Sequence, residues 1–258
     1  MPLSNYQFSF NSLTFGAGTN YVINAIDGLG GMMPLRTQDD NKGYQDGTWS
    51  GRDFYDSRTI TFQILITGDA THSAQYYYAQ MQSAFAPQML GYPSELKLFQ
   101  FQLTADTGAK RMYGRVRGLD TIIDPEFGYG YILTSVTFLF PDPRYYDETE
   151  LTTSGSSAVS VANAGWATTC PTITIASPSA TSFSITDSVT GVVMAFSNVN
   201  TSYSVVIDLL NRTIQNNGYA RNILSSATTD WLYVPGNTTG SWTSTGGSMS
   251  IAWRSAYV

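Results

Sequence analysis

Alternating apolar and polar residues dominate the first half of the chain and predict β-strands. The clearest run covers 58–67, where Ile60, Phe62 and Ile64 alternate with polar residues. A period of two places one face of a strand inward and the other outward. The same reasoning predicts further strands at 6–15, 21–26, 96–103, 111–123 and 129–140, with a hairpin-type turn at 16–20.

One segment changes from strand to helical period. Between Thr71 and Phe85, Met81 and either Tyr77 or Tyr78 fall at helical spacing. The helix is expected to begin with Thr71 or Ser73 as its N-cap, because a hydroxyl can accept a bond from the first free amides. It is expected to end before Pro87, and it is the only helix predicted.

The stretch Met32–Arg52 shows neither the strand period of two nor the helical period, and it is rich in Gly and Asp. It predicts a long loop or a β-arm. A connection of this length inside a compact domain is usually functional, disordered or ordered by a partner.

The second half shows short strand-like runs separated by turn residues, which favours a β-sandwich or jelly roll. The expected strands are 172–176, 182–186, 192–196, 203–208, 212–215, 231–234 and 249–253. Three parts are therefore expected: a mainly β domain with one helix at 1–146, a Thr/Ser/Glu-rich linker at 147–160, and a β-sandwich at 161–258. Pro141 and Pro143 end the last strand of the first domain.

The composition is that of a globular protein, with 42% hydrophobic and 12% charged residues in 258. The net charge of −6 gives no basic field for nucleic acid. The first residues lack the pattern of a signal peptide, and no run is long enough to span a membrane, so no membrane partner is expected. Charge is uneven: residues 1–150 hold 10 of 13 Lys and Arg and 16 of 19 Asp and Glu.

Candidate catalytic and metal-binding chemistry is sparse. His72 is the single histidine and Cys170 the single cysteine, so no intrachain disulfide and no cysteine-based zinc cage can form. Asp39 could begin a calcium loop, but Tyr44 stands where such a loop needs glycine. Glu148 and Glu150 are neighbours rather than acids across a cleft. No enzyme activity, cofactor or metal is expected, and a hydrolase using His72 or Glu148 is the least favoured hypothesis.

Five residues of the first half are candidate contacts between subunits. Arg111, Arg115 and Arg117 recur at even spacing and predict a basic stripe on one strand face, joined by Tyr113. Because the whole chain is acidic, an acidic surface of a neighbouring subunit is the favoured partner, while a solvated face remains the alternative. Arg52 and Asp46 of the arm complete the set.

A second hypothesis comes from four tryptophans on a low-charge β background, which are Trp166, Trp231, Trp242 and Trp253. Sugar-binding sandwiches stack aromatic rings on pyranose rings, with polar side chains alongside. Trp231, Trp242 and Asn237 are the candidate contacts to a glycan or another partner. Core packing is the alternative for these tryptophans.

Motifs in a characteristic order resemble a known family. Tyr21-Val22-Ile23, Arg58-Thr59-Ile60-Thr61-Phe62, Ala84-Phe85-Ala86-Pro87, Met112-Tyr113-Gly114-Arg115-Val116 and the run from Val136 to Tyr146 resemble the distal tail proteins of long-tailed bacteriophages. In the second half, Cys170-Pro171-Thr172, Val206-Ile207-Asp208, Val234-Pro235-Gly236-Asn237 and Ile251-Ala252-Trp253 look like the family's galectin-like sandwich.

The resemblance implies a split β-barrel-like first domain with a helix, forming a hexameric ring, and an outer galectin-like sandwich. It also implies a place at the tail tip of the virion, between the tail tube protein and the tail-associated and receptor-binding proteins. The family supplies no catalytic residues. DNA would be only passing cargo, and the 32–52 arm would contact a neighbour.

Overall fold

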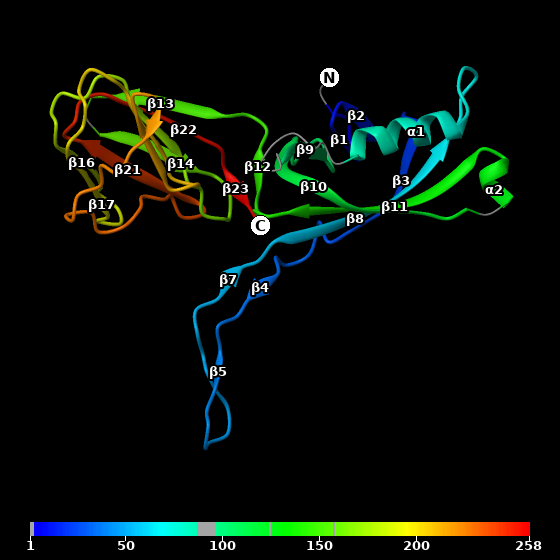
Figure 1. Ribbon diagram of the computed structural model, residues 1–258, viewed down its shortest axis with the longest axis horizontal. Coiled ribbons are helices and arrows are strands. Elements are labelled where there is room, and N and C mark those ends of the chain that lie inside the picture. Colours follow the sequence, from blue (N-terminus) through cyan, green and yellow to red (C-terminus); the bar gives the residue numbers. More distant parts are fainter. Residues whose placement is uncertain (1–2, 87–95, 124, 157) are drawn as a thin grey trace. The chain divides into compact units, whose positions relative to one another are not determined.

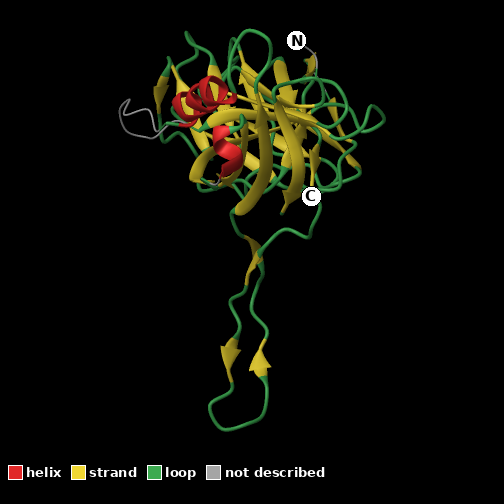
Figure 2. Cartoon of the chain, turned by 90° about the vertical axis from the view of Figure 1, so that its right-hand side faces the viewer, coloured by secondary structure: helices red, strands yellow, loops and turns green. Residues whose placement is uncertain are grey.

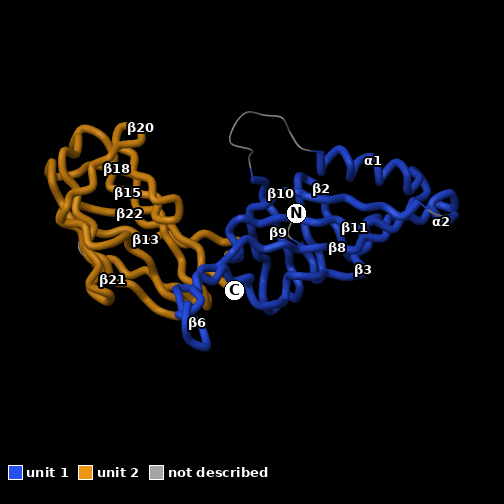
Figure 3. Tube along the Cα trace, turned by 60° about the horizontal axis from the view of Figure 1, so that its bottom comes forward, with its two compact units in different colours: residues 1–145, 258 blue, residues 146–257 orange. Residues whose placement is uncertain are grey.

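A computed structural model describes residues 3–86, 96–123, 125–156 and 158–258. The chain divides into two compact units, shown in Figure 3. Unit 1 comprises residues 1–145 with residue 258, and unit 2 comprises 146–257.

Unit 1 is built on an antiparallel sheet with the strand order β2-β1-β9-β10-β11-β8-β3 (Figure 1). Its strands are β1 (Gln7–Phe10), β2 (Leu13–Gly16), β3 (Tyr21–Asp27), β8 (Arg58–Thr67), β9 (Lys97–Gln102), β10 (Lys110–Thr121) and β11 (Tyr131–Phe140). The prediction for 58–67 is confirmed with the same bounds. The hydrophobic alternation there is fixed by burial, because Ile60, Phe62, Ile64 and Ile66 are all fully buried.

Helix α1 (Ala74–Phe85) covers one face of this sheet. Its N-cap is Ser73, one of the two predicted, whose hydroxyl accepts a bond from the Tyr76 amide at 3.4 Å. Met81 and Phe85 are buried as the helical spacing predicted. The predicted stop, Pro87, lies outside the described residues. The helix and sheet enclose a core rich in phenylalanine. The Phe138 ring there has six neighbouring rings, which are Phe8, Phe10, Phe62, Phe85, Phe99 and Phe140.

Two features of unit 1 differ from the prediction. The run 6–15 is a hairpin rather than one strand, because Asn11 and Ser12 adopt positive φ angles of 47° and 70° and reverse the chain. A second helix, α2 (Pro125–Gly128), is present in the described part of the chain. It is a single turn, and a segment this short cannot show the hydrophobic period by which a helix is predicted.

The predicted arm is an extended hairpin that leaves the sheet between β3 and β8 (Figure 2). Its short strands are β4 (Leu35–Arg36), β5 (Asp40–Asn41), β6 (Thr48–Trp49) and β7 (Phe54–Tyr55). β4 pairs with β7, and β5 pairs with β6. The arm is therefore a two-stranded structure with exposed strands, not an irregular loop.

Unit 2 is a sandwich of two antiparallel sheets, with the orders β13-β22-β15-β18-β19-β20 and β14-β21-β16-β17. The strands are β13 (Leu151–Gly155), β14 (Val159–Asn163), β15 (Thr172–Ile175), β16 (Phe183–Asp187), β17 (Val193–Phe196), β18 (Val205–Asp208), β19 (Thr213–Asn216), β20 (Tyr219–Ala220), β21 (Thr238–Ser244) and β22 (Met249–Trp253). Strand β12 (Tyr145–Asp147) pairs with β23 (Ala256–Tyr257). One core, including Ile173 and Ile207 of one sheet and Ile185 and Met194 of the other, joins the two sheets.

The predicted linker 147–160 is wrong as a description of the structure. It contains all of β13, which pairs with β22, and the start of β14, which pairs with β21. The Arg254 guanidinium donates to the carbonyl oxygens of Asp147, at 3.3 Å, and Glu148, and it lies 3.7 Å from the Glu150 carboxylate. β13 is short and mostly polar and has no buried residue, so its composition resembles that of a linker.

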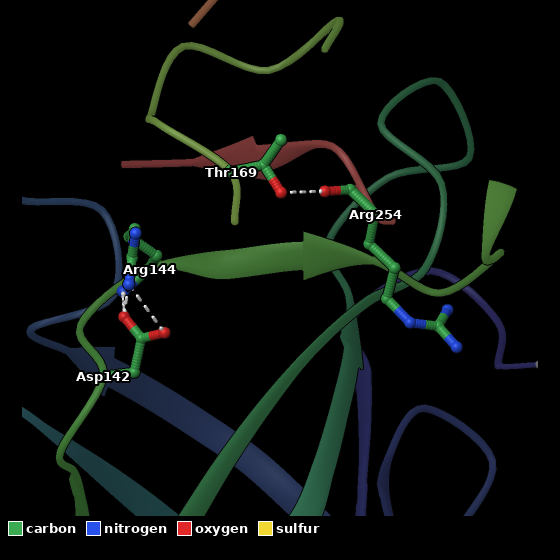
Figure 4. A network of polar contacts seen from close by, with 4 residues as sticks. All are labelled: Asp142, Arg144, Thr169 and Arg254. Carbon is green, nitrogen blue, oxygen red and sulfur yellow. Dashed lines mark hydrogen bonds and ion pairs between the residues drawn. The ribbon is translucent and has the colours of Figure 1, made fainter. Parts of the chain in front are cut away.

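In unit 2 the short strand β20 was also not predicted, and another departure concerns 231–234. There Val234 forms an isolated bridge with Thr169 rather than a strand, while the unpredicted strand β21 follows at once. The Thr169 hydroxyl also donates to the Arg254 carbonyl oxygen at 2.8 Å (Figure 4).

The turn after β11 has a local explanation. Arg144 donates through Nε to Oδ1 of Asp142 at 2.8 Å and through a terminal nitrogen to Oδ2 at 3.2 Å (Figure 4). A two-pronged contact between an arginine and a carboxylate fixes orientation as well as distance. Together with Pro141 and Pro143, which have no amide hydrogen, it ends the last long strand of unit 1.

Candidate interaction surfaces

The root of the arm is fixed by a buried arginine. Arg58, at the start of β8, donates to the carbonyl oxygens of Leu29 at 3.5 Å and Gly31 at 3.3 Å. Its burial lowers the pKa of the guanidinium. Gly28 has a φ of 81°, and a Cβ there would lie 2.3 Å from the Thr59 carbonyl oxygen. The residues that start the arm therefore hold one conformation against the sheet.

Beyond its root the arm presents aromatic and charged side chains to solvent. Trp49 is 66% exposed, and the Lys42 ammonium lies 5.0 Å from its ring centre. Arg36 and Arg52 lie 5.7 and 5.5 Å from the ring of Phe54. Both candidate residues of the arm, Arg52 and Asp46, are exposed. The arm therefore combines cationic and aromatic side chains in contact with each other, as protein contact surfaces often do.

The predicted basic stripe is present only in part. On β10 the residues Arg111, Tyr113 and Arg115 share the outward face, and the Arg111 guanidinium lies 5.5 Å from the Tyr113 ring centre. The register against β11 then skips between Val116 and Gly118, so Arg117 sits in a β-bulge. A bulge inserts one extra residue and changes the direction in which the following side chains point. The alternation of residues in the sequence does not show where a bulge occurs. Arg117 is exposed, whereas Arg111 and Arg115 are half-buried.

Sequence reasoning missed an apolar surface at the far end of the same sheet. Ile123 and Tyr129 are 80% and 82% exposed, and Ile122, Tyr131 and Leu133 are also exposed. The Ile122 amide donates to the Leu133 carbonyl oxygen at 3.1 Å, so the strand ends lie side by side. We call these five residues the apolar end. The alternation along β11 already indicates that Tyr131 and Leu133 face outward, but not that other apolar residues join them.

An open pocket of about 550 Å³ lies beside the start of α1, lined by 67–74 and 129–131. It contains His72, whose ring stacks on Tyr76 with the centres 4.0 Å apart. Asp69 accepts bonds from the Tyr77 hydroxyl at 2.5 Å and from the Thr71 and His72 amides, each at 2.8 Å. These bonds, the Tyr77 bond foremost, lower the pKa of the Asp69 carboxyl. Asp69 thus fixes the turn before the helix.

His72 lines this pocket in unit 1, and Glu148 and Glu150 belong to unit 2. Within the described ranges, no group of three or more His, Cys, Asp or Glu could hold a metal ion. Neither of the two helices there is long and apolar enough to cross a membrane.

The ionisation of Tyr21 makes the stability of unit 1 depend on pH at high pH. Burial, followed by the electrostatic effect of Tyr77, raises the pKa of Tyr21 from 10.0 to about 12. The neutral phenol therefore stabilises the fold fully below pH 10.0, and this contribution is lost as pH rises through about 12. In urea unfolding at increasing pH, the free energy of unfolding should fall less steeply over this interval for Tyr21→Phe than for the wild type. Tyr129→Phe, at an exposed ring, should show the same dependence of this free energy on pH as the wild type. The same dependence on pH in all three proteins would contradict the raised pKa of Tyr21.

The three candidate glycan contacts of unit 2 do not lie together on the surface. Trp242 is fully buried in the core, so its assignment to a glycan is wrong: its position on β21 faces the opposing sheet. Trp231 is half-buried and packs against the same core. Asn237 is exposed. The exposed tryptophan of unit 2 is instead Trp166, which sequence reasoning did not separate from the others.

No protein-family model and no curated protein matches the chain. Among solved structures it is similar to the SPP1 Dit protein, described as a paradigm of the hub adsorption apparatus in phages that infect Gram-positive bacteria. That match has a TM-score of 0.71 at 16% identity and covers 98% of this chain and 99% of the other.

The chain is also similar to a protein of the phage p2 baseplate in its activated conformation. With Sr the TM-score is 0.52 and with Ca it is 0.50, each at 10% identity, and the matches cover 96% and 95% of this chain and 97% of the other. The chain therefore has the β-rich fold of a Dit protein over both units, which confirms the predicted fold class.

Proposed function

We propose that this protein is a non-enzymatic structural component of a bacteriophage tail tip. In this role it forms a hexameric ring that joins the tail tube to the tail-tip and receptor-binding proteins of the virion. The observation that carries the proposal is the match of both units, over 98% of the chain, to a phage hub protein at a TM-score of 0.71.

The surfaces of unit 1 support assembly of this kind. A closed ring of identical subunits uses a heterologous interface, in which each subunit meets the next through two different surfaces. Unit 1 offers the arm, with exposed Trp49 and Tyr55, and the separate apolar end around Ile123 and Tyr129. Exposed apolar groups gathered in this way are typical of contact sites.

Charge supports a pairing of the arm with the basic stripe of the next subunit. Between residues 32 and 57 the chain has five aspartates and three basic residues. Strand β10 instead carries the half-buried Arg111 and Arg115 on its outward face and the exposed Arg117 in the bulge that follows. Opposite charge on two surfaces guides association and fixes register, even where each exposed pair contributes little.

Native mass spectrometry of the purified full chain tests the proposal. A six-fold species is expected at micromolar protein. A protein that stays monomeric both alone and in isolated tails would contradict it.

Reversing one exposed charge of the stripe should weaken assembly. Arg117→Glu places a carboxylate opposite the acidic arm and is expected to cost about 1 kcal/mol per interface, which raises the dissociation constant about fivefold. Sedimentation at low and high salt measures the effect, which should shrink as salt screens it.

Arg221→Glu is the matched control, because Arg221 is an exposed arginine of unit 2. It should leave assembly unchanged. Equal effects of the two substitutions would mean that net charge, rather than the stripe, governs association.

A further inference from the structure

We propose that the surface around Trp166 in unit 2 is a binding site for a neutral saccharide, with the indole ring as its stacking platform. The proposal does not depend on ring formation, since all its residues belong to one unit. Among the tryptophans that the sequence suggested, it selects the one that the structure exposes.

Trp166 is unusual among the tryptophans of its unit. It is 76% exposed, whereas Trp242 and Trp253 are buried and Trp231 is half-buried. The neighbouring Ala167 and Thr169 are buried, so Trp166 and Thr168 share the outward face of this segment. A ring this large, left in water, has its faces available for a ligand.

The backbone that carries Trp166 is held by a buried amide. Asn163 is 2% exposed, and its Nδ2 donates to the carbonyl oxygens of Ala167 at 2.7 Å and Pro235 at 3.1 Å. Its Oδ1 accepts from the amides of Gly165 at 3.1 Å and Ala256 at 3.3 Å. Both polar atoms of Asn163 are used, so one side chain ties the turn to two neighbouring segments.

Close backbone packing fixes the same turn further. A Cβ on Gly165 would lie 1.8 Å from the Ala256 carbonyl oxygen, and one on Gly236 would lie 2.2 Å from the Trp166 carbonyl oxygen. The Asn237 amide donates to the Gly165 carbonyl oxygen at 2.6 Å. The platform is therefore preorganised, which lowers the entropy lost when a ligand binds.

The surroundings of the platform fit a neutral, hydroxyl-rich ligand. Asn237, which has a left-handed φ of 53°, and Thr238 are exposed on the adjoining turn. Tyr233 is exposed next to the buried Val234, on the segment that pairs with Thr169. Beyond residue 150 the chain has only three acidic and three basic residues, so no strong field selects a charged ligand. Aromatic rings beside amide and hydroxyl groups are the elements that bind pyranose rings.

Ligand-observed NMR and a glycan array on the full chain test this site. The solution probes are maltotetraose, cellotetraose and tetra-N-acetylchitotetraose, at concentrations up to the millimolar range. The wild type should bind a neutral glycan with a Kd of about 1 mM or below, and Trp166→Ala should weaken binding at least about tenfold. Trp166→Phe should retain part of the affinity, because a smaller aromatic face remains.

Tyr219→Ala is the matched control, since Tyr219 is an exposed aromatic residue on β20 of the same unit, and it should bind as the wild type does. Absence of wild-type binding to every neutral glycan of the array would overturn the proposal. Binding that survives Trp166→Ala would overturn it too. So would a result in which Trp166→Ala leaves glycan binding intact but abolishes binding to another tail protein.

Discussion

Replacing residues 36–54 with an Asn-Gly turn should give a folded protein that no longer assembles. The pair Leu35 and Tyr55 stays in place, and Asn-Gly closes a two-residue hairpin between them. The removed strands β5 and β6 are exposed and pair only with each other, so the core of unit 1 does not depend on them. If the arm provides one of the two ring surfaces, its loss opens every interface at once.

Native mass spectrometry should show monomer for the truncated chain at concentrations where the wild type is assembled. Thermal unfolding should remain cooperative, which separates lost assembly from lost folding. Trp49→Ala, which removes a single exposed ring of the arm, should have an intermediate effect. Wild-type assembly of the truncated chain would show that the arm has another role.

Phe138→Ala should destabilise unit 1 by about 3–5 kcal/mol, the usual cost of removing a buried ring. Phe138 is fully buried, and its ring centre lies 5.1 Å from that of Phe10 and 5.3 Å from that of Phe99. The rigid sheet on one side and helix α1 on the other leave little room for the core to collapse into the cavity.

Urea unfolding measures the loss, with separate transitions expected for two compact units. The transition of unit 1 should move and that of unit 2 should not. Phe138→Leu should cost less, because it leaves a smaller cavity. Phe54→Ala, at an exposed phenylalanine of the arm, should lie within about 0.5 kcal/mol of the wild type. A Phe138→Ala protein as stable as the wild type would contradict the assignment of this core.

The sequence predicted those elements whose pattern has a direct physical cause. Strand β8 was found because its alternation reflects one buried face, and the start of α1 because the Ser73 hydroxyl caps it. The arm was found because its composition fits neither strand nor helix. In each case the information is local, within a few residues along the chain.

What was missed depends on contacts between distant segments. Strand β13 exists because it pairs with β22, about a hundred residues later, and its own residues are mostly polar. Trp242 and Trp166 are the same residue type on similar backgrounds, yet Trp242 is buried on strand β21 and Trp166 is exposed on a turn. The apolar end lies in the single connection between β10 and β11 and at the start of β11, but the strand pattern does not show that Ile122, Ile123 and Tyr129 are exposed there. Composition cannot distinguish these outcomes.

Electron microscopy of the purified full chain, and of isolated tails, tests the central claim most directly. A closed six-fold ring with a central channel is expected, with most of the contacts between subunits made by residues before 147. Monomers in both preparations, or a ring whose contacts lie mainly in residues after 147, would contradict it.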